Sequence, residues 1–374
     1  MSNLPDIQKK NWLISAEKTH SITNLLLDIS ETRQCNEEVT FLGSKTRRSF
    51  FPSSLISSNP EIFYSHYQHL EVLGSPVVEN NIAYYGTDDS QVIALDITTK
   101  SEVWRFKTGG SIRSCPAIML DNLYIGSFDK HLYCINKKSG YPKWKFKTGD
   151  WVFASPLVYQ GMVIFGSLDH YIYAVDAISG KLVWKVKTEG WLISSPSFYH
   201  GKILNASRDG RIYLIDALSG KTENTFLQGS AIHATIGIEG DKAFIGTINN
   251  EMFMFDLHKK SKIWQHNAIK GIIASPLIME DYALFASRDG FLYCFDKNTG
   301  RKIWETYLNA PLISSPASDG INIIIGNDDG IIFNINANNG EIMKQIATGQ
   351  RIRSTAFFAG NKVVIGGKWL YVIQ

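Results

Sequence analysis

The amino-acid sequence predicts an all-β protein, an eight-bladed β-propeller of four-stranded blades whose ring is closed by a strand from the N-terminal side. Three observations lead to this prediction. A 40-residue unit is repeated eight times, each copy holds short apolar segments separated by turn residues, and the last copy lacks its fourth segment. Repeats of about 40 residues with four strands each are typical of propeller blades.

The repeat is clearest in a dipeptide that recurs at intervals of 40 residues or multiples of 40. It occurs as Ser75-Pro76, Ser155-Pro156, Ser195-Pro196, Ser275-Pro276 and Ser315-Pro316, with Cys115-Pro116 in the second copy. A small residue stands ten positions after each proline position. These residues are Gly86, Gly126, Gly166, Ala206, Gly246, Ala286, Gly326 and Gly366. Eight copies in register, without net insertion or deletion, indicate one continuous ring.

The third copy illustrates the four strands of a unit. Its apolar segments are 154–160, 162–167, 171–176 and 181–188, and Gly, Asp and Ser separate them. Alternating or short apolar runs bounded by such residues are the signature of strands and turns. No stretch of 75–374 has a sustained helical period, so the repeat is expected to be entirely β.

The N-terminal side of the repeat can supply the missing strand. One repeat length before the fourth strand of the first copy stands EIFYSHYQ, residues 61–68, with Tyr64 in register with Trp104. We expect this strand to close the ring and remove an open edge. Residues 1–60 lie outside the repeat and form an extension, partly helical or irregular. Its segment 13–30 could form one short amphipathic helix, and the extension is expected to pack on the propeller or dock a partner.

Composition excludes several classes of function. The chain has 374 residues, is 44% hydrophobic and 20% charged, and carries a formal net charge of +3. This charge is too small to indicate a nucleic-acid partner. No apolar run approaches the roughly 18 residues of a membrane span, and the N-terminus lacks the apolar stretch of a secretory signal. We therefore expect a cytoplasmic, monomeric propeller without membrane insertion.

The four cysteines, Cys35, Cys115, Cys134 and Cys294, agree with that location. Cys134 and Cys294 are four copies apart, on opposite sides of an eight-fold ring. Cys115 and Cys134 would lie on the first and third strands of one blade. Because neighbouring strands are about 4.8 Å apart, this pair is too distant for a disulfide. Free thiols suit a reducing compartment.

The turn before the fourth strand carries a recognisable motif. The segments AVDAISGKLVW (174–184), CFDKNTGRKIW (294–304) and CINKKSGYPKW (134–144) resemble the tryptophan-docking repeat of quinoprotein-type propellers. The resemblance extends over about 61–374. In such a turn, Asp can accept backbone N–H bonds and Gly can adopt the left-handed conformation. The tryptophan supplies a large flat body between blades, so five residues are expected to be structural: Trp104, Trp144, Trp184, Trp264 and Trp304.

The resemblance implies two classes of function, because fold alone does not choose between them. Some members are dehydrogenases that hold pyrroloquinoline quinone and calcium in the central funnel. Others resemble the propeller lipoprotein of the outer-membrane β-barrel assembly machinery, which binds proteins and has no catalytic activity. This sequence has no adjacent cysteines and no insertions between copies. We therefore expect a non-catalytic protein- or peptide-binding scaffold without catalytic residues, metal or cofactor. The alternatives are a small-ligand or quinone-binding propeller and, less favoured, a quinone-dependent dehydrogenase.

A candidate binding site lies at the entrance of the channel. The fourth residue before each proline position is always apolar, whereas the residues beside it vary from copy to copy. Variation where the scaffold demands nothing is where function can be placed. The varied positions include an aromatic group, a cationic group and one histidine: Trp151, Phe153 and Trp191; Arg113, Arg351 and Arg353; and His233.

Such a surface suits a partner with apolar and acidic groups. The alternative is that these side chains fill the funnel and stack on each other. Three basic turn residues, Arg208, Arg288 and Lys368, add positive charge to the same face. Asp88 and Asp328 are extra acidic residues at the equivalent turn, and no metal role is expected for them.

Overall fold

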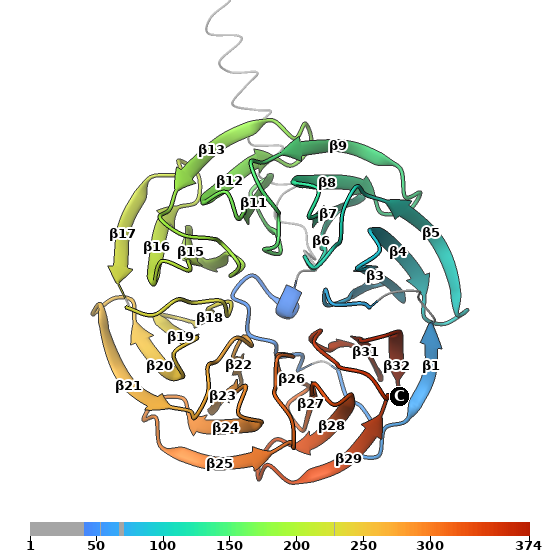
Figure 1. Ribbon diagram of the computed structural model, residues 1–374, viewed down its shortest axis with the longest axis vertical. Coiled ribbons are helices and arrows are strands. Elements are labelled where there is room, and N and C mark those ends of the chain that lie inside the picture. The colour runs from blue at the N-terminus through green and yellow to red at the C-terminus, as the bar shows by residue number, and fades with distance from the viewer. Residues whose placement is uncertain (1–40, 53, 67–70, 228) are drawn as a thin grey trace, which may run out of the picture. The chain divides into compact units, whose positions relative to one another are not determined.

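The computed structural model describes residues 41–52, 54–66, 71–227 and 229–374. The helix expected at 13–30 lies outside these residues. The described chain forms eight four-stranded antiparallel sheets arranged in a ring (Figure 1). The prediction of an eight-bladed propeller is therefore confirmed. The one helix among the described residues is the 3₁₀ turn η1 (Phe41–Gly43), and no described helix could span a membrane.

Blades 1 to 4 follow the chain, each with its strands in order from the axis outwards. Blade 1 holds β2 (Val77–Glu79), β3 (Ile82–Gly86), β4 (Gln91–Asp96) and β5 (Ser101–Lys107). Blade 2 holds β6 (Ala117–Met119), β7 (Asn122–Gly126), β8 (His131–Asn136) and β9 (Pro142–Lys147). Blade 3 holds β10 (Leu157–Tyr159), β11 (Met162–Gly166), β12 (Tyr171–Asp176) and β13 (Leu182–Lys187). Blade 4 holds β14 (Ser197–Tyr199), β15 (Lys202–Ala206), β16 (Arg211–Asp216) and β17 (Thr222–Leu227).

Blades 5 to 7 repeat this order. Blade 5 holds β18 (Gly237–Glu239), β19 (Lys242–Gly246), β20 (Glu251–Asp256) and β21 (Ser261–Asn267). Blade 6 holds β22 (Leu277–Ile278), β23 (Tyr282–Ala286), β24 (Phe291–Asp296) and β25 (Lys302–Tyr307). Blade 7 holds β26 (Ala317–Ser318), β27 (Asn322–Gly326), β28 (Ile331–Asn336) and β29 (Ile342–Ala347).

Blade 8 combines the two ends of the repeat. Its inner strands are β30 (Phe357–Ala359), β31 (Lys362–Gly366) and β32 (Leu370–Ile373), and its outer strand is β1 (Ile62–His66). Ser65 pairs with Tyr371, and the backbones of Glu61 and Gln374 exchange two hydrogen bonds of 3.1 Å. The predicted closing strand is therefore confirmed. Closure gives the final sheet its fourth strand and leaves no open edge between blades 8 and 1.

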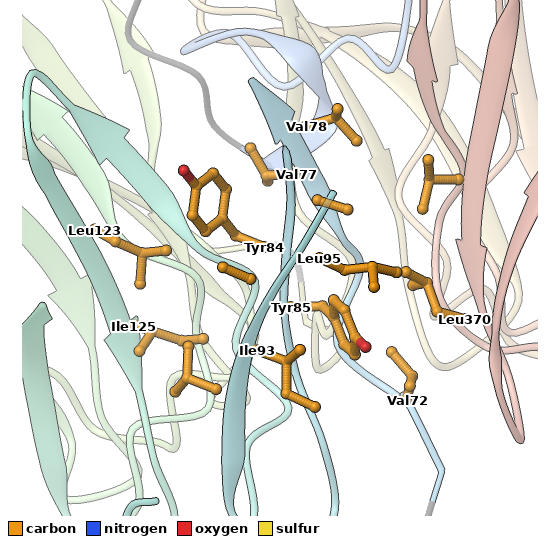
Figure 2. Close-up of a cluster of buried hydrophobic side chains, with 14 of the residues drawn as sticks. Val72, Val77, Val78, Tyr84, Tyr85, Ile93, Leu95, Leu123, Ile125 and Leu370 are labelled. Atoms are coloured by element: carbon orange, nitrogen blue, oxygen red, sulfur yellow. The ribbon is translucent and has the colours of Figure 1, made fainter. Parts of the chain in front are cut away.

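The core lies between successive blades. The middle strands are buried on both faces because each sheet packs between two others, which explains their uninterrupted apolar runs. Figure 2 shows this arrangement around blade 1, where Tyr84, Tyr85 and Ile93 lie between Ile125 of β7 and Leu370 of β32. The apolar residue four before each proline position is fully buried in all eight blades, as expected: Val72, Ile112, Val152, Leu192, Ile232, Ile272, Leu312 and Ile352.

The five docking tryptophans contact the next blade in one repeated way. Four of them donate an indole N–H to a backbone carbonyl 33 residues further along the chain, as Trp104 does to Lys137 at 2.8 Å. All five also lie against a left-handed glycine of the next blade. A Cβ on Gly140, Gly180, Gly220, Gly300 or Gly340 would come within 2.4–2.8 Å of an indole carbon.

The two residues that form this contact vary together from copy to copy. Every motif tryptophan has a glycine 36 residues later, whereas Tyr64 and Asn224, which replace it, are followed by Lys100 and Lys260 at that distance. Both lysines keep the left-handed conformation, with φ of 62° and 57°. The turn therefore has the same backbone conformation with or without glycine. Glycine occurs where the indole of the preceding blade fills the space that a side chain would occupy. These contacts support a structural role for the tryptophans.

The extension reaches the axis of the ring. Figure 1 shows η1 at its centre. Beyond η1, the backbone carbonyls of residues 45, 46, 48 and 49 accept one N–H each from four consecutive blades, at 2.9–3.1 Å. The donors are Phe198, Ile238, Ile278 and Ser318. The chain then crosses blade 7, where Asp319 and Asn334 contact residues 56 and 58, and continues into β1. Residues 41–66 therefore connect the axis of the ring to its rim.

Candidate functional site

A cavity of about 250 Å³ lies on the axis, lined by two residues from each blade. We call it the cup. Its outer level, the wall, consists of Leu73, Arg113, Phe153, Ile193, His233, Ile273, Ile313 and Arg353. Its inner level, the belt, consists of Ser75, Cys115, Ser155, Ser195, Thr235, Ser275, Ser315 and Thr355. Wall and belt residues are two positions apart in each extended segment, so their side chains face the axis together.

The belt is a nearly continuous circuit of hydrogen bonds. In seven of the eight blades, the backbone N–H of a belt residue donates to the side-chain oxygen or sulfur of the next blade's belt residue, at 2.8–3.2 Å. Ser75 donates to the Cys115 sulfur in this way at 3.1 Å. In the sequence the Ser-Pro dipeptide marks the repeat, and this role in the belt was not predicted from it. A hydroxyl or thiol at all eight positions was the signal that could have revealed it.

Arg47 lies at the inner end of the axis. Its side chain is fully buried; Nε donates to the Pro196 carbonyl at 3.1 Å and Nη2 to the Pro156 carbonyl at 3.0 Å. Burial lowers the pKa of Arg47 to about 9, so the guanidinium is still protonated at neutral pH. Because these prolines directly follow belt residues, the extension covers the axis beyond the belt. Nothing in the repeat pattern predicted this, because residues 41–60 are not part of the repeat.

The structure divides the predicted site residues into two groups. Four line the cup: Arg113, Phe153, His233 and Arg353. The other three, Trp151, Trp191 and Arg351, lie two residues earlier in their blades and do not line it. Trp151 and Trp191 are 44% and 43% exposed and belong to neighbouring blades. We refer to these three residues as the mouth.

The three predicted arginines all have carboxylate partners. Arg353 donates from Nε and Nη2 to the two oxygens of Asp328, both at 2.8 Å, and this raises its pKa. Arg113 lies 3.4 Å from Asp88, and Arg351 lies 3.3 Å from Glu71. Each pair joins two adjacent blades. The extra turn aspartates are therefore the partners of two of these arginines, a pairing that was not predicted from the sequence.

Aromatic contacts hold the mouth tryptophans in place. Trp151 stacks on Phe128 with ring centroids 4.4 Å apart and planes 7° apart, and Phe128 also contacts Phe153 at 5.8 Å. The guanidinium of Arg208 lies 4.7 Å from the ring centroid of Trp191. Stacking and cation–π contacts of this kind fix the orientation of a half-exposed ring. The mouth therefore presents two oriented apolar surfaces to solvent.

His233 is the polar wall residue on the side of the cup away from the ion pairs. Its Nε2 is buried and has no hydrogen-bond partner among the described residues. Burial lowers the pKa of His233, and the positive charges of Arg208 and Arg288 lower it further. The imidazole is therefore neutral at neutral pH. The ring lines the cup, and its buried Nε2 has no partner among the described residues.

The residues of the cup do not fit a calcium-bound quinone. The cavity is lined by hydroxyls, one thiol, apolar side chains, two arginines and a histidine, with no carboxylate or amide oxygen. Carboxylate and amide oxygens are the side-chain ligands from which calcium sites are mainly built. Within the described ranges, no three His, Cys, Asp or Glu side chains are placed to hold a metal ion.

The eight-fold ring, the axial cup and the Trp–Gly contacts define the chain as a PQQ-like repeat β-propeller. Comparison with family models agrees. The model described as outer membrane protein assembly factor BamB matches residues 66–149, 88–177, 166–270 and 249–369. Together these matches cover most of the chain, which belongs to this family.

Solved structures share the fold at low sequence identity. BamB from Moraxella catarrhalis has a TM-score of 0.73 at 18% identity, covering 84% of this chain and 99% of that one. Quinohemoprotein alcohol dehydrogenase from Comamonas testosteroni has a TM-score of 0.78 at 13% identity, with coverages of 89% and 80%. A europium-containing methanol dehydrogenase has a TM-score of 0.72 at 13% identity, with coverages of 87% and 89%. At these identities the likeness concerns the fold alone. A comparison with curated protein sequences finds no match.

Proposed function

We propose that this protein is a non-catalytic scaffold that binds a protein or peptide partner at the channel face of its propeller. The observation that carries the proposal is the pair of oriented, half-exposed indoles, Trp151 and Trp191, on neighbouring blades. Exposed tryptophan supplies a large apolar contact area at low cost in side-chain entropy, and it is enriched among residues that dominate binding energy. The family model that matches the chain is described as an outer membrane protein assembly factor, which fits a role in binding proteins.

The surroundings of the indoles support the same reading. The ion pairs Arg113–Asp88 and Arg351–Glu71 lie at the same face and are partly exposed. Partly exposed charged pairs around apolar anchors resemble the polar rim of a protein interface, where they direct specificity more than affinity. The partner surface is therefore expected to be apolar at its centre and mixed in charge around it. This differs from the partner with apolar and acidic groups that the sequence suggested, because the three arginines already have carboxylate partners.

The test is capture of a partner from native cells by the immobilised full-length protein and by its Trp151→Ala/Trp191→Ala variant. We expect the variant to lose at least about tenfold in capture, because buried interface tryptophans often contribute 2 kcal/mol or more. Its melting temperature should change little, since both side chains are almost half exposed. A large loss of stability would instead favour the alternative that these residues fill the funnel.

A matched control uses Tyr141→Ala/Ile178→Ala. These side chains are 74% and 78% exposed and stand in turns before the outer strands of blades 2 and 3. The control removes exposed apolar surface away from the mouth, on blades 2 and 3, whereas the two mouth tryptophans belong to blades 3 and 4. Equal loss of capture in both double variants would contradict a channel-face site.

Binding of a quinone cofactor is the second candidate function, and the lining of the cup argues against it. The comparison is direct: the visible absorption spectrum of the purified protein is recorded with and without added pyrroloquinoline quinone and calcium. We expect no stoichiometric chromophore. A bound quinone that is reduced on addition of an alcohol would overturn the proposal of a non-catalytic scaffold.

We also propose a cytoplasmic location. Its support is that the three described cysteines, Cys115, Cys134 and Cys294, are buried free thiols. Burial raises the pKa of Cys134 to about 12, which keeps this thiol protonated and unreactive. Fractionation of the source cells tests the proposal, and recovery with periplasmic rather than cytoplasmic markers would refute it.

A further inference from the structure

The cup offers hydrogen-bond donors with few acceptors to match them. Each belt oxygen that accepts a backbone N–H still has its own O–H to donate. Among the described residues, no acceptor receives the hydroxyl hydrogens of five belt residues on consecutive blades. These residues are Ser195, Thr235, Ser275, Ser315 and Thr355. Arg353, which also lines the cup, adds a charged donor beside them. A group that enters this sector therefore meets five hydroxyl hydrogens that no described residue accepts.

The wall beside these donors is apolar except for His233 and Arg353. Ile193, Ile273 and Ile313 line the same sector as the five free hydroxyls, and Leu73, Arg113 and Phe153 line the remainder. No acidic side chain lines the cavity: Asp88 and Asp328, which pair with the wall residues Arg113 and Arg353, lie outside its lining. The cup therefore combines an apolar body with a base of donors. Such sites orient a ligand by its polar end and hold it by apolar contact.

The size of the cavity limits the ligand. An apolar cavity of about 150 Å³ can hold benzene, and this cup has about 250 Å³. A compact ring or branched chain with one carboxylate therefore fits. Because residues 45–49 and Arg47 cover the inner end, the ligand must enter from the mouth.

We propose that the cup binds a monocarboxylate with a compact apolar body, its carboxylate accepting hydrogen bonds from the belt hydroxyls. Hydrogen bonds from several donors to an ionised acceptor are stronger than those between neutral groups. The carboxylate can belong to a free small molecule or to the chain end of a peptide. This inference goes beyond the proposed function, since a small ligand could occupy the cup without any protein partner.

Cys115 shows which substitution of a belt residue keeps the belt intact. At Cys115 the belt keeps its acceptor, because sulfur receives the Ser75 N–H, but a thiol is only a weak donor. Ser275→Cys should therefore preserve the hydrogen bond from Thr235 N–H while weakening one donor to the ligand. Cys115→Ser makes the reverse change. Both variants keep the belt connected, so both are expected to fold.

The probe is benzoate, titrated by calorimetry into the full-length protein, with benzamide as the neutral isostere. We expect one benzoate per chain and at least about tenfold weaker binding of benzamide. Ser275→Cys should weaken benzoate binding about threefold, and Cys115→Ser should strengthen it by a similar factor. Thermal melts of both variants check that folding is intact.

The pH dependence of binding gives a second measurement. A bound carboxylate near His233 favours the imidazolium form. Burial opposes this form, and so do the positive charges of Arg208 and Arg288. Arg113 and Arg353, which line the same cavity, also oppose it. Benzoate should therefore bind more tightly as the pH falls toward the lowered pKa of His233. His233→Gln should remove this dependence.

A peptide distinguishes the two sources of the carboxylate. A tetrapeptide that ends in a free phenylalanine carboxylate is compared with its C-terminal amide and with benzoate. Tighter binding of the peptide than of benzoate assigns the site to a chain end, and weaker binding assigns it to a small molecule. Either result supports the shared chemistry.

Three results would overturn the inference: no saturable benzoate binding, equal affinity for benzoate and benzamide, or affinities unchanged in both cysteine–serine exchanges. The first would mean that the cup holds only water. The Trp151/Trp191 capture experiment is independent of all three. Failure of the cup therefore leaves the proposed scaffold function intact, and the reverse also holds.

Discussion

The contact between a motif tryptophan and the glycine of the next blade makes a quantitative prediction at Gly220. This glycine has φ of +71°, and a Cβ would lie 2.6 Å from Cγ and 2.7 Å from Cδ2 of Trp184. Alanine in the left-handed region costs about 1–2 kcal/mol. The indole, which is only 8% exposed, must also move and lose its 3.1 Å bond to the Ala217 carbonyl, which costs about a further 2–3 kcal/mol. Gly220→Ala should therefore destabilise the protein by about 3–5 kcal/mol.

Gly201 of the same blade provides the matched control. Its φ is +77°, and a Cβ there would meet nothing within 4 Å. Gly201→Ala should therefore cost only the backbone term, about 1–2 kcal/mol. In thermal unfolding followed by circular dichroism, the melting temperature of Gly220→Ala should fall about 5 °C further than that of Gly201→Ala.

Equal melting temperatures for the two variants would refute the reasoning. They would show that the indole can move away from the added methyl group without loss. The tryptophans would then fill space on the blade surface without docking on the next blade. The expected structural role of all five would have to be abandoned, since they share one geometry.

Two further predictions concern the axis. Burial lowers the pKa of His233 from 6.5 in the folded protein. As the pH falls, this histidine is therefore protonated in the unfolded chain before it is protonated in the folded one. The free energy of unfolding should decrease from about pH 6.5 down to the lower pKa of the folded state. Urea midpoints at about pH 7 and pH 5 should therefore fall less for His233→Gln than for the parent, and equal losses would contradict this assignment. Arg47→Met leaves the Pro156 and Pro196 carbonyls without these donors inside the protein and should destabilise it by about 2–4 kcal/mol. An unchanged melting temperature would show that the extension contributes nothing at the axis.

Much of the fold could be predicted because the information is local and repeated. Each strand is short and bounded by its own turn residues, and the pattern occurs eight times, so a degenerate copy such as 334–344 is identified by its register. Closure was also predictable. The missing fourth strand and the segment 61–68 can both be recognised in the sequence, and the edge of a β-sheet needs a partner strand.

The candidate site was predictable only in part. The varied positions beside the buried apolar residue are visible in the sequence, and four of the seven chosen residues line the cup. Their partners were not visible. Asp328 and Arg353 are 25 residues apart in different blades, and no sequence rule places two such side chains 2.8 Å from each other. How deep each side chain lies in the channel also depends on how the blades are arranged in the ring. This arrangement places Phe153 in the wall and Trp151 at the mouth.

By itself, the sequence determined the number of blades, the position of every strand, the buried residue at each channel entrance and the strand that closes the ring. These features follow from apolar periodicity and turn chemistry, which act over a few residues. Only the tertiary structure decided that hydroxyls 40 residues apart form one belt, that arginines and aspartates pair between blades, and that Arg47 covers the inner end of the axis. These features depend on distances between remote segments. Such distances exist only after the ring has closed.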